Sequence, residues 1–313
     1  MLHLRTVSPP EKTERVLELL SEHRGATHLV LLKGAAVQPA GDVVEADIAR
    51  ESADDIIDGL CELGLDHTGG ITLEVIDTAL SDAADQAEED APGEGADAVV
   101  WQELLGRTGE ESRLNVTFLS FLTFACMLTA VGVVTGSSVT IVGAMVVGPE
   151  FGPLAAVAVG LVMRRWDLVR RAAAALAVGF PVAMLITLAF TVVGEATGLF
   201  DRAALLGDHD VDFIYQVGPY SLIVALLAGA AGMLSLTSAK SAALVGVFIS
   251  VTTVPAAGYA VVAAVLNEWG RCIGSVVQLV INLVGVVAAA AVVLMLRRKG
   301  QRRASTERPL SRG

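Results

Sequence analysis

The chain has 313 residues, of which 53% are hydrophobic and 18% charged, and its formal net charge is −12. Residues 1–112 hold 7 Lys/Arg and 25 Asp/Glu, whereas residues 113–313 hold 15 and 9 and are otherwise strongly apolar. This division excludes an ordinary soluble globule, a disordered chain and a secreted disulfide scaffold, and the acidic balance argues against nucleic acid as a partner.

Residues 1–76 alternate between strand-like and helix-like patterns. Apolar side chains recur at every second position in residues 2–6, 44–48 and 71–75, which is the period of a half-buried strand. Leu29–Leu32 is a continuous apolar run that favours a central strand, and residues 16–20 and 56–63 carry helical apolar stripes. The resulting β-α-β-β-α-β order predicts an α+β, ferredoxin-like domain.

The polar residues of this region suggest no metal or cofactor site. His3, His23, His28 and His67 are scattered, so each is expected to be a surface or strand residue. The three cysteines, Cys61, Cys126 and Cys272, lie far apart in the chain and form neither a redox motif nor a zinc motif.

Two shorter segments connect this domain to the apolar half. Residues 77–97 are acidic and contain Ala, Gly and Pro, a composition that predicts a solvated linker. In residues 98–112, Val100, Trp101, Leu104 and Leu105 fall on one helical face. This pattern predicts an amphipathic helix lying on the membrane surface.

Six apolar runs follow, each long enough to cross a bilayer as a helix of roughly 18 residues or more. Five contain no charged residue, and the second contains Glu150. The runs are Leu114–Thr135, Val139–Met163, Ala172–Gly194, Val217–Leu236, Ser241–Leu266 and Ile273–Leu296. The sequence therefore predicts a mainly helical protein with a six-span membrane domain over residues 113–296 and a basic tail over residues 297–313.

Basic residues gather in every second connection between these runs. They are Arg107 and Arg113, then Arg164, Arg165, Arg170 and Arg171, then Lys240, and finally Arg297–Lys299. Because basic loops stay on the cytoplasmic side, both termini are expected to be cytoplasmic.

The second run contains the feature most informative about function. Pro149, Gly152 and Pro153 surround Glu150, and each proline removes a backbone donor and disfavours helix in the residue before it. Interrupted backbone persists in a membrane only within protein or beside a water-lined cavity, and a carboxyl group there usually faces a path or a partner. We therefore expect Glu150 to lie on a solute or ion path. Alternatively, Glu150 is kept neutral by burial, or it caps the second half of the helix.

The fifth run contains a weaker similarity to this segment. Ser138–Gly143 resembles Ser241–Gly246 at an offset of 103 residues, and Pro255 with Gly258 is expected to interrupt the fifth span. Matching interruptions suggest a 3+3 inverted repeat, a transporter signature, although chance similarity among Ala/Gly/Val-rich helices is the alternative.

Other polar and small residues in the runs have two interpretations. Thr252, Thr253 and Asn282 are further candidates for the path, or they join helices by hydrogen bonds. Small residues such as those of Ala228–Gly232 allow close helix approach, within one chain or in a homo-oligomer.

With these residues in view, the apolar half resembles the conserved hydrophobic membrane family known as domain of unknown function 389, found in bacteria and archaea. The resemblance covers residues 114–296 and rests on Ile141–Met145 leading to Pro149 and Gly152–Pro153, on Leu244–Val247 leading to Val254–Pro255, and on Asn282–Leu283. It implies the inner (plasma) membrane of a prokaryote and names no activity.

Two departures from this family are notable. Glu150 stands where much of the family is expected to be apolar, and Pro255–Ala256 replaces a typical double proline. A carboxylate-dependent mechanism would therefore belong to a subgroup.

These patterns predict a transporter or channel for a small solute or ion, embedded in the lipid bilayer and carrying a cytoplasmic regulatory module. The alternative is a membrane-anchored ligand sensor or scaffold that acts through the ferredoxin-like domain. An enzyme is not expected, because the hydroxyls of Thr237–Ser241 lie beside Lys240 without a paired base.

Overall fold

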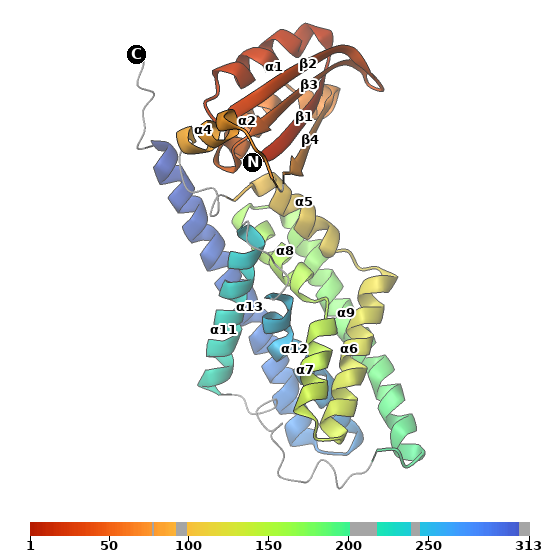
Figure 1. The fold of residues 1–313 in the computed structure, drawn as a ribbon. Coiled ribbons are helices and arrows are strands. Elements are labelled where there is room, and N and C mark those ends of the chain that lie inside the picture. The colour runs from red at the N-terminus through yellow and green to blue at the C-terminus, as the bar shows by residue number, and fades with distance from the viewer. Residues whose placement is uncertain (77, 92–98, 201–217, 239–244, 307–313) are drawn as a thin grey trace. The chain divides into compact units, whose positions relative to one another are not determined.

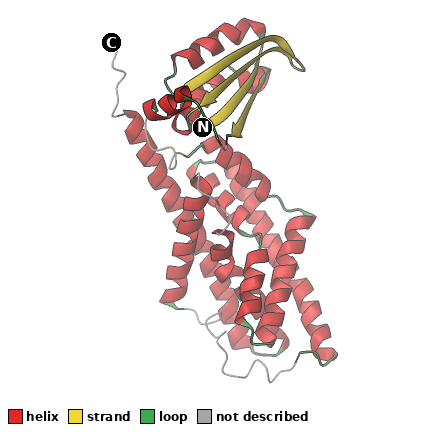
Figure 2. Cartoon of the chain, in the orientation of Figure 1, coloured by secondary structure: helices red, strands yellow, loops and turns green. Residues whose placement is uncertain are grey.

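A computed structural model describes residues 1–76, 78–91, 99–200, 218–238 and 245–306, with only the backbone for residues 245–252 and 301–306. The chain divides into two compact units, one made mainly of Met1–Glu103 and the other mainly of Leu104–Leu236 and Lys240–Arg297. Figures 1 and 2 show their elements.

The first unit contains a four-stranded antiparallel sheet with strand order β2-β3-β1-β4 (Figure 2). The predicted β-α-β-β-α-β order is found, with short helical turns added after β3 and before β4. The elements are β1 (Leu2–Ser8), α1 (Pro10–Glu22), β2 (Ala26–Val37), β3 (Ala40–Ile48), a 3₁₀ turn (Arg50–Ser52), α2 (Ala53–Glu62), α3 (Leu65–Thr68), β4 (Gly70–Val75) and α4 (Asp82–Asp90).

The core of this unit lies between the sheet and helices α1 and α2. Every second residue of β1 and β3 is buried, so one face of the sheet carries the apolar side chains that the sequence pattern predicts. Its largest fully buried members include Leu2, Leu4, Leu20, Ile48, Ile56 and Leu60. Burying each such side chain stabilises the fold by about 1.5–3 kcal/mol.

The prediction that Leu29–Leu32 forms a central strand is wrong. These residues belong to β2, which lies at the edge of the sheet, and Leu29, Val30 and Leu32 are 38%, 42% and 45% exposed. The pairing of β2 with β3 shifts register between Thr27 and Val30, and again between Leu32 and Ala36. A continuous apolar run therefore did not indicate burial on both faces.

The segment predicted to be a solvated linker contains helix α4. Its buried residues Ala84 and Ala87, followed by Ala91, repeat at helical spacing, and the helix contacts β2 and β3. The prediction is therefore wrong for residues 82–91, because the acidic composition concealed a stripe of alanines on the opposite face. Residues 77 and 92–97 lie outside the described residues.

The second unit is entirely helical in the part of the chain that the structure describes. Its elements are α5 (Trp101–Glu111), α6 (Val116–Val134), α7 (Ser138–Val147), α8 (Phe151–Val162), α9 (Trp166–Ala196), α11 (Pro219–Thr237), α12 (Val245–Val265) and α13 (Trp269–Thr306) (Figure 1). Helix α5 coincides with the predicted amphipathic helix. The last helix continues past Leu296, so the backbone of the predicted basic tail is helical as far as Thr306.

Four of these helices, α6, α9, α11 and α13, are long and apolar enough to cross a membrane. The pair α7 and α8 counts as a fifth span if the bent pair is taken as one. Helix α12 corresponds to the predicted fifth run, but the side chains of its first turns lie outside the described residues. The apolar helices support a membrane protein, and the number of six spans stays a prediction.

Helix α12 is continuous, so the predicted interruption at Pro255 and Gly258 is wrong. A single internal proline removes only one backbone donor, and the turns on either side keep the helix intact. Gly258 instead allows α12 to pack closely against α6. A Cβ on Gly258 would lie 2.6 Å from Thr129 Cβ and 2.9 Å from the Cys126 carbonyl oxygen of α6.

This contact predicts that Gly258→Ala destabilises the protein, because its methyl group would push α12 away from α6 at a cost of about 1–3 kcal/mol. Gly143→Ala on α7 is the matched control, since no atom lies within 4 Å of its Cβ position. Thermal unfolding in detergent should show a lower Tm for Gly258→Ala and an unchanged or higher Tm for Gly143→Ala. Equal stability of the two variants would contradict this account of the α6–α12 packing.

Candidate functional site

The site is built on the interruption between α7 and α8. Helix α7 ends at Val147, helix α8 begins at Phe151, and the two axes differ by 52°. Gly148 is extended (φ −65°, ψ 126°), as expected for a residue that precedes a proline. Pro153 lies in the first turn of α8, where a missing backbone donor costs nothing. The predicted interruption of the second span is confirmed.

Glu150 lies in this interruption with its side chain fully buried. Its Oε1 accepts a hydrogen bond from the Thr253 hydroxyl of α12 at 2.6 Å. Although Glu150 occupies the N-cap position of α8, its side chain makes no capping hydrogen bond, so the capping interpretation is wrong. The two site residues that the structure joins directly therefore come from the second and fifth predicted spans.

A cavity of about 410 Å³ reaches the same interruption. Pro149 and Gly152 line it together with Gly148 and Phe151. Its other walls are formed by the end of α5, the start of α6 and the end of α11, through Arg107, Glu110, Glu111, Arg113, Asn115, Thr117, Phe118, Phe121, Gly232, Ser235 and Leu236. The cavity thus brings charged and polar side chains to the point where the apolar helix is broken.

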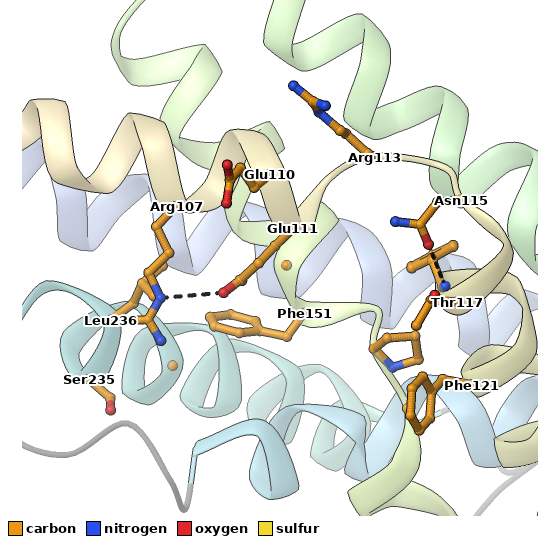
Figure 3. A pocket seen from close by; sticks show the side chains of 15 residues that line it. Arg107, Glu110, Glu111, Arg113, Asn115, Thr117, Phe121, Phe151, Ser235 and Leu236 are labelled. Atoms are coloured by element: carbon orange, nitrogen blue, oxygen red, sulfur yellow. Dashed lines mark hydrogen bonds and ion pairs between the residues drawn. The ribbon is translucent and has the colours of Figure 1, made fainter.

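Figure 3 shows how the walls of the cavity are held. Arg107 Nε lies 3.3 Å from Glu111 Oε1, and this ion pair and Phe151 line one side. On the other side the Asn115 side chain caps α6 by accepting a hydrogen bond from the backbone N–H of Phe118 at 2.7 Å. A Cβ on Gly152 would lie 2.7 Å from Glu111 Cβ, so only glycine lets α8 begin this close to Glu111.

The remaining predicted site residues are distributed over α12 and α13. Pro255 is buried inside α12, and Thr252 belongs to the same helix but its side chain is not described. Asn282 is fully buried in α13 and accepts a hydrogen bond from Gln278 Nε2 at 3.4 Å.

In a comparison with protein families, residues 145–288 match the family described as Domain of unknown function (DUF389). The resemblance to this family that the sequence indicates is therefore confirmed over these residues. Comparisons with curated proteins and with solved structures gave no match.

The DUF389 region contains the interruption, Thr253 and Asn282, so the Glu150–Thr253 hydrogen bond lies within it. Arg107, Glu111 and Asn115 precede it. The cavity is therefore formed jointly by residues within the matched region and by α5 and the start of α6, which lie outside it.

Sequence reasoning missed two groups of residues. Of the charged residues that line the cavity, Arg107 and Arg113 were interpreted only as markers of orientation, and Glu110 and Glu111 were not singled out. On α13, Ser275 and Gln278 are buried on the same helical face as Asn282. Their spacing of three to four residues within an apolar run was a readable signal, because a polar stripe at helical period faces one direction.

Two of these buried groups have no hydrogen-bond partner among the residues that the structure describes. They are the Ser275 hydroxyl and the Gln278 side-chain carbonyl oxygen. A buried polar group without a protein partner is usually satisfied by water or ligand. The α13 stripe therefore marks a part of the helical unit that is suited to hold water or a polar solute.

The Glu150–Thr253 hydrogen bond predicts that Thr253→Val lowers the free energy of unfolding by about 1–2 kcal/mol, because the buried carboxyl loses a donor. Thr129→Val on α6 is the matched control, since the buried Thr129 hydroxyl has no partner among the described residues. Unfolding in detergent should separate the two variants. If both valine variants behaved alike, the hydrogen bond would not contribute to stability.

Proposed function

We propose that the protein is a multi-pass membrane transporter or channel for a small solute or ion. The observation that carries the proposal is the helix interruption that holds a buried Glu150, bonded to Thr253, while its neighbours Gly148, Pro149, Phe151 and Gly152 line a cavity. The match to DUF389 is compatible with a membrane location and names no activity.

The physical argument starts from the cost of polar groups in hydrocarbon. A carboxyl group and free backbone groups at mid-span destabilise a lipid-facing helix by several kcal/mol. They are maintained where a path needs them, beside water or a solute. The cavity at Gly148–Gly152 and the unpartnered polar atoms of Ser275 and Gln278 both support a hydrated path through the helical unit.

The spacing of Glu150 and Thr253 supports an inverted repeat. They are 103 residues apart, which is the offset between the similar segments at Ser138 and Ser241. Two equivalent positions of a two-fold repeat can touch only close to the symmetry axis. The hydrogen bond would therefore lie where the axis crosses the membrane domain, the usual place of a transport site.

The amino-terminal unit completes the proposal as a cytoplasmic regulatory module of ferredoxin-like fold. Its antiparallel order β2-β3-β1-β4, with α1 and α2 on one face, supports that fold. With six spans, basic connections on one side and both termini in the cytoplasm, the module would face the cell interior.

One observation favours the alternative of a sensor or scaffold. The edge strand β2 exposes Leu29, Val30 and Leu32, and an exposed apolar edge is a surface on which a partner strand can pair. In that case the module would bind a partner or another copy of the chain, and the helical unit would be an anchor.

Flux measurements in proteoliposomes test the proposal. We expect the wild-type protein to conduct at least one solute from a panel of inorganic cations, inorganic anions and small organic solutes. Glu150→Gln, which keeps the size of the side chain but removes its acidic group, and Glu150→Ala should lower that flux about tenfold or more. Gly143→Ala, whose added methyl group meets no atom within 4 Å, is the control and should transport normally.

An unchanged flux in the variants and an absent flux in the wild type have different consequences. A flux that is unchanged in both Glu150 variants would remove Glu150 from the path. Absence of wild-type flux across the whole panel would favour the sensor or scaffold.

The native cysteines predict the orientation of the chain. Cys272, partly exposed in α13, should react with a membrane-impermeant maleimide applied to intact cells. Cys61, partly exposed in the amino-terminal unit, should react only after lysis, and the buried Cys126 should react slowly in both cases. Burial raises the pKa of the Cys61 thiol, so labelling at mildly alkaline pH makes the comparison fair. Labelling of Cys61 from outside would overturn the proposed orientation.

A further inference from the structure

Three side chains of the amino-terminal unit form a hydrogen-bonded chain that the proposed transport function does not use. Ser81 Oγ lies 2.9 Å from His28 Nε2, and His28 Nδ1 lies 2.8 Å from Asp47 Oδ2. They come from the residue preceding α4, from β2 and from β3. Ser81 bonds the Nε2 side of the imidazole and Asp47 the Nδ1 side, which is the arrangement of a serine nucleophile, its general base and a positioning carboxylate.

The hydrogen bonds select the reactive form of His28. Burial would raise the pKa of Asp47, but hydrogen bonds from His3 and His28 outweigh it and hold the pKa below its ordinary value. An ionised carboxylate only accepts hydrogen bonds, so the proton of neutral His28 is on Nδ1. Nε2 is then an acceptor, and the Ser81 hydroxyl must be the donor. His3 Nδ1, at 2.8 Å from Asp47 Oδ1, holds the carboxylate from its other side.

Ser81 also stands where a negative charge can be stabilised. It is the N-cap residue of the nine-residue helix α4, yet its side chain makes no capping hydrogen bond. The hydroxyl that would ordinarily satisfy the first turn is directed to His28 instead. The first backbone N–H groups of α4, those of Asp82 and Ala83, have no acceptor within the helix and lie next to Ser81 Oγ in the chain. These groups are suited to stabilise an oxyanion that forms at the serine.

The backbone around His28 is built for this placement. His28 has a left-handed conformation, with φ 51°, at the register shift where β2 and β3 pass from Thr27–Asp47 to Val30–Glu45 pairing. A residue other than glycine rarely adopts this conformation, and such strain, like the bulge itself, is concentrated at sites where a side chain must be aimed. Here it aims the imidazole between Asp47 and Ser81.

We propose that Ser81, His28 and Asp47 form a nucleophilic site that hydrolyses small carboxylic esters that are uncharged or cationic. The charge preference follows from α4, which carries Asp82, Asp85, Glu88, Glu89 and Asp90 and would repel an anionic substrate. Ser81 and His28 would be the catalytic residues, and Asp47 and His3 the positioning residues.

The chemistry proceeds in two balanced steps. Ser81 Oγ attacks the ester carbonyl carbon while His28 Nε2 takes the hydroxyl proton, and the tetrahedral intermediate collapses as that proton passes to the departing alcohol. Water then attacks the acyl-serine, His28 takes its proton, and Ser81 leaves with that proton as the carboxylic acid is released. No oxidant, reductant or metal enters either step.

The test uses the full-length protein in detergent with a fluorophosphonate probe and, separately, with p-nitrophenyl acetate. We expect mass spectrometry to locate the fluorophosphonyl group, and a transient acetyl group, on Ser81. Ser81→Ala should abolish both. Asp47→Asn, which changes the hydrogen-bonding partner of His28 Nδ1 but little of the shape, should slow labelling on the order of 10³–10⁴-fold. Ser21→Ala, which changes an exposed serine on α1, is the control and should be labelled like the wild type.

These measurements distinguish a catalytic role of the three residues from a structural one. If Ser81 of the wild-type protein takes up neither probe, or Asp47→Asn is labelled as fast as the wild type, the three residues only fasten α4 to the sheet. The wild-type measurement decides this even if a variant fails to fold. Hydrogen exchange in β1–β4 confirms that each variant compared retains its sheet.

Discussion

The helical unit depends on one constraint: a polar interruption inside apolar helices must find its hydrogen-bond partners within the protein. The residues Gly148–Glu150 break the helix, and Thr253 supplies a donor to the buried carboxyl. That donor can be reached only if α12 packs tightly on its neighbours. Gly258 provides this by letting α12 approach the backbone of α6 at Cys126. The close packing of α12 and the buried hydrogen bond are therefore two parts of one arrangement.

The two similar segments contribute different chemistry to this arrangement. The α7–α8 pair, which follows the first segment, is interrupted beside two prolines and carries the acceptor, whereas α12 contains one proline, is helical over Val245–Val265 and carries the donor. An exact repeat would place two carboxyls or two hydroxyls against each other near the axis. Two buried carboxyls would repel each other strongly when ionised. In the proposed inverted repeat, a carboxyl and a hydroxyl at equivalent positions form a hydrogen bond instead, so the departure from strict symmetry would stabilise the contact.

Much of this fold could be predicted from the spacing of apolar residues along the sequence, because that spacing shows which side of each strand or helix is buried. The strands at residues 2–8, 40–48 and 70–75, the apolar helices and the interruption at Glu150 all gave local signals. The errors arose where tertiary contacts decide the outcome. Leu29–Leu32 is apolar but lies at an edge, the acidic segment around Ala84 and Ala87 folds against the sheet, and Pro255 leaves α12 intact. The cavity was also beyond sequence reasoning, since it joins α5, α8 and α11 across long sequence separations.

The Ser81–His28–Asp47 cluster could not be predicted from the sequence either. The three residues share no motif and are separated by strands whose register could not be known in advance. A single histidine in an edge strand carries no signal of its own, and the serine lies in a segment whose composition suggested a linker. Only the pairing of Thr27 with Asp47, the bulge at His28 and the start of α4 bring the hydroxyl, imidazole and carboxylate together. The cluster therefore depends on the register of the sheet, because a shift of one residue between β2 and β3 would turn the His28 side chain to the other face, away from Asp47.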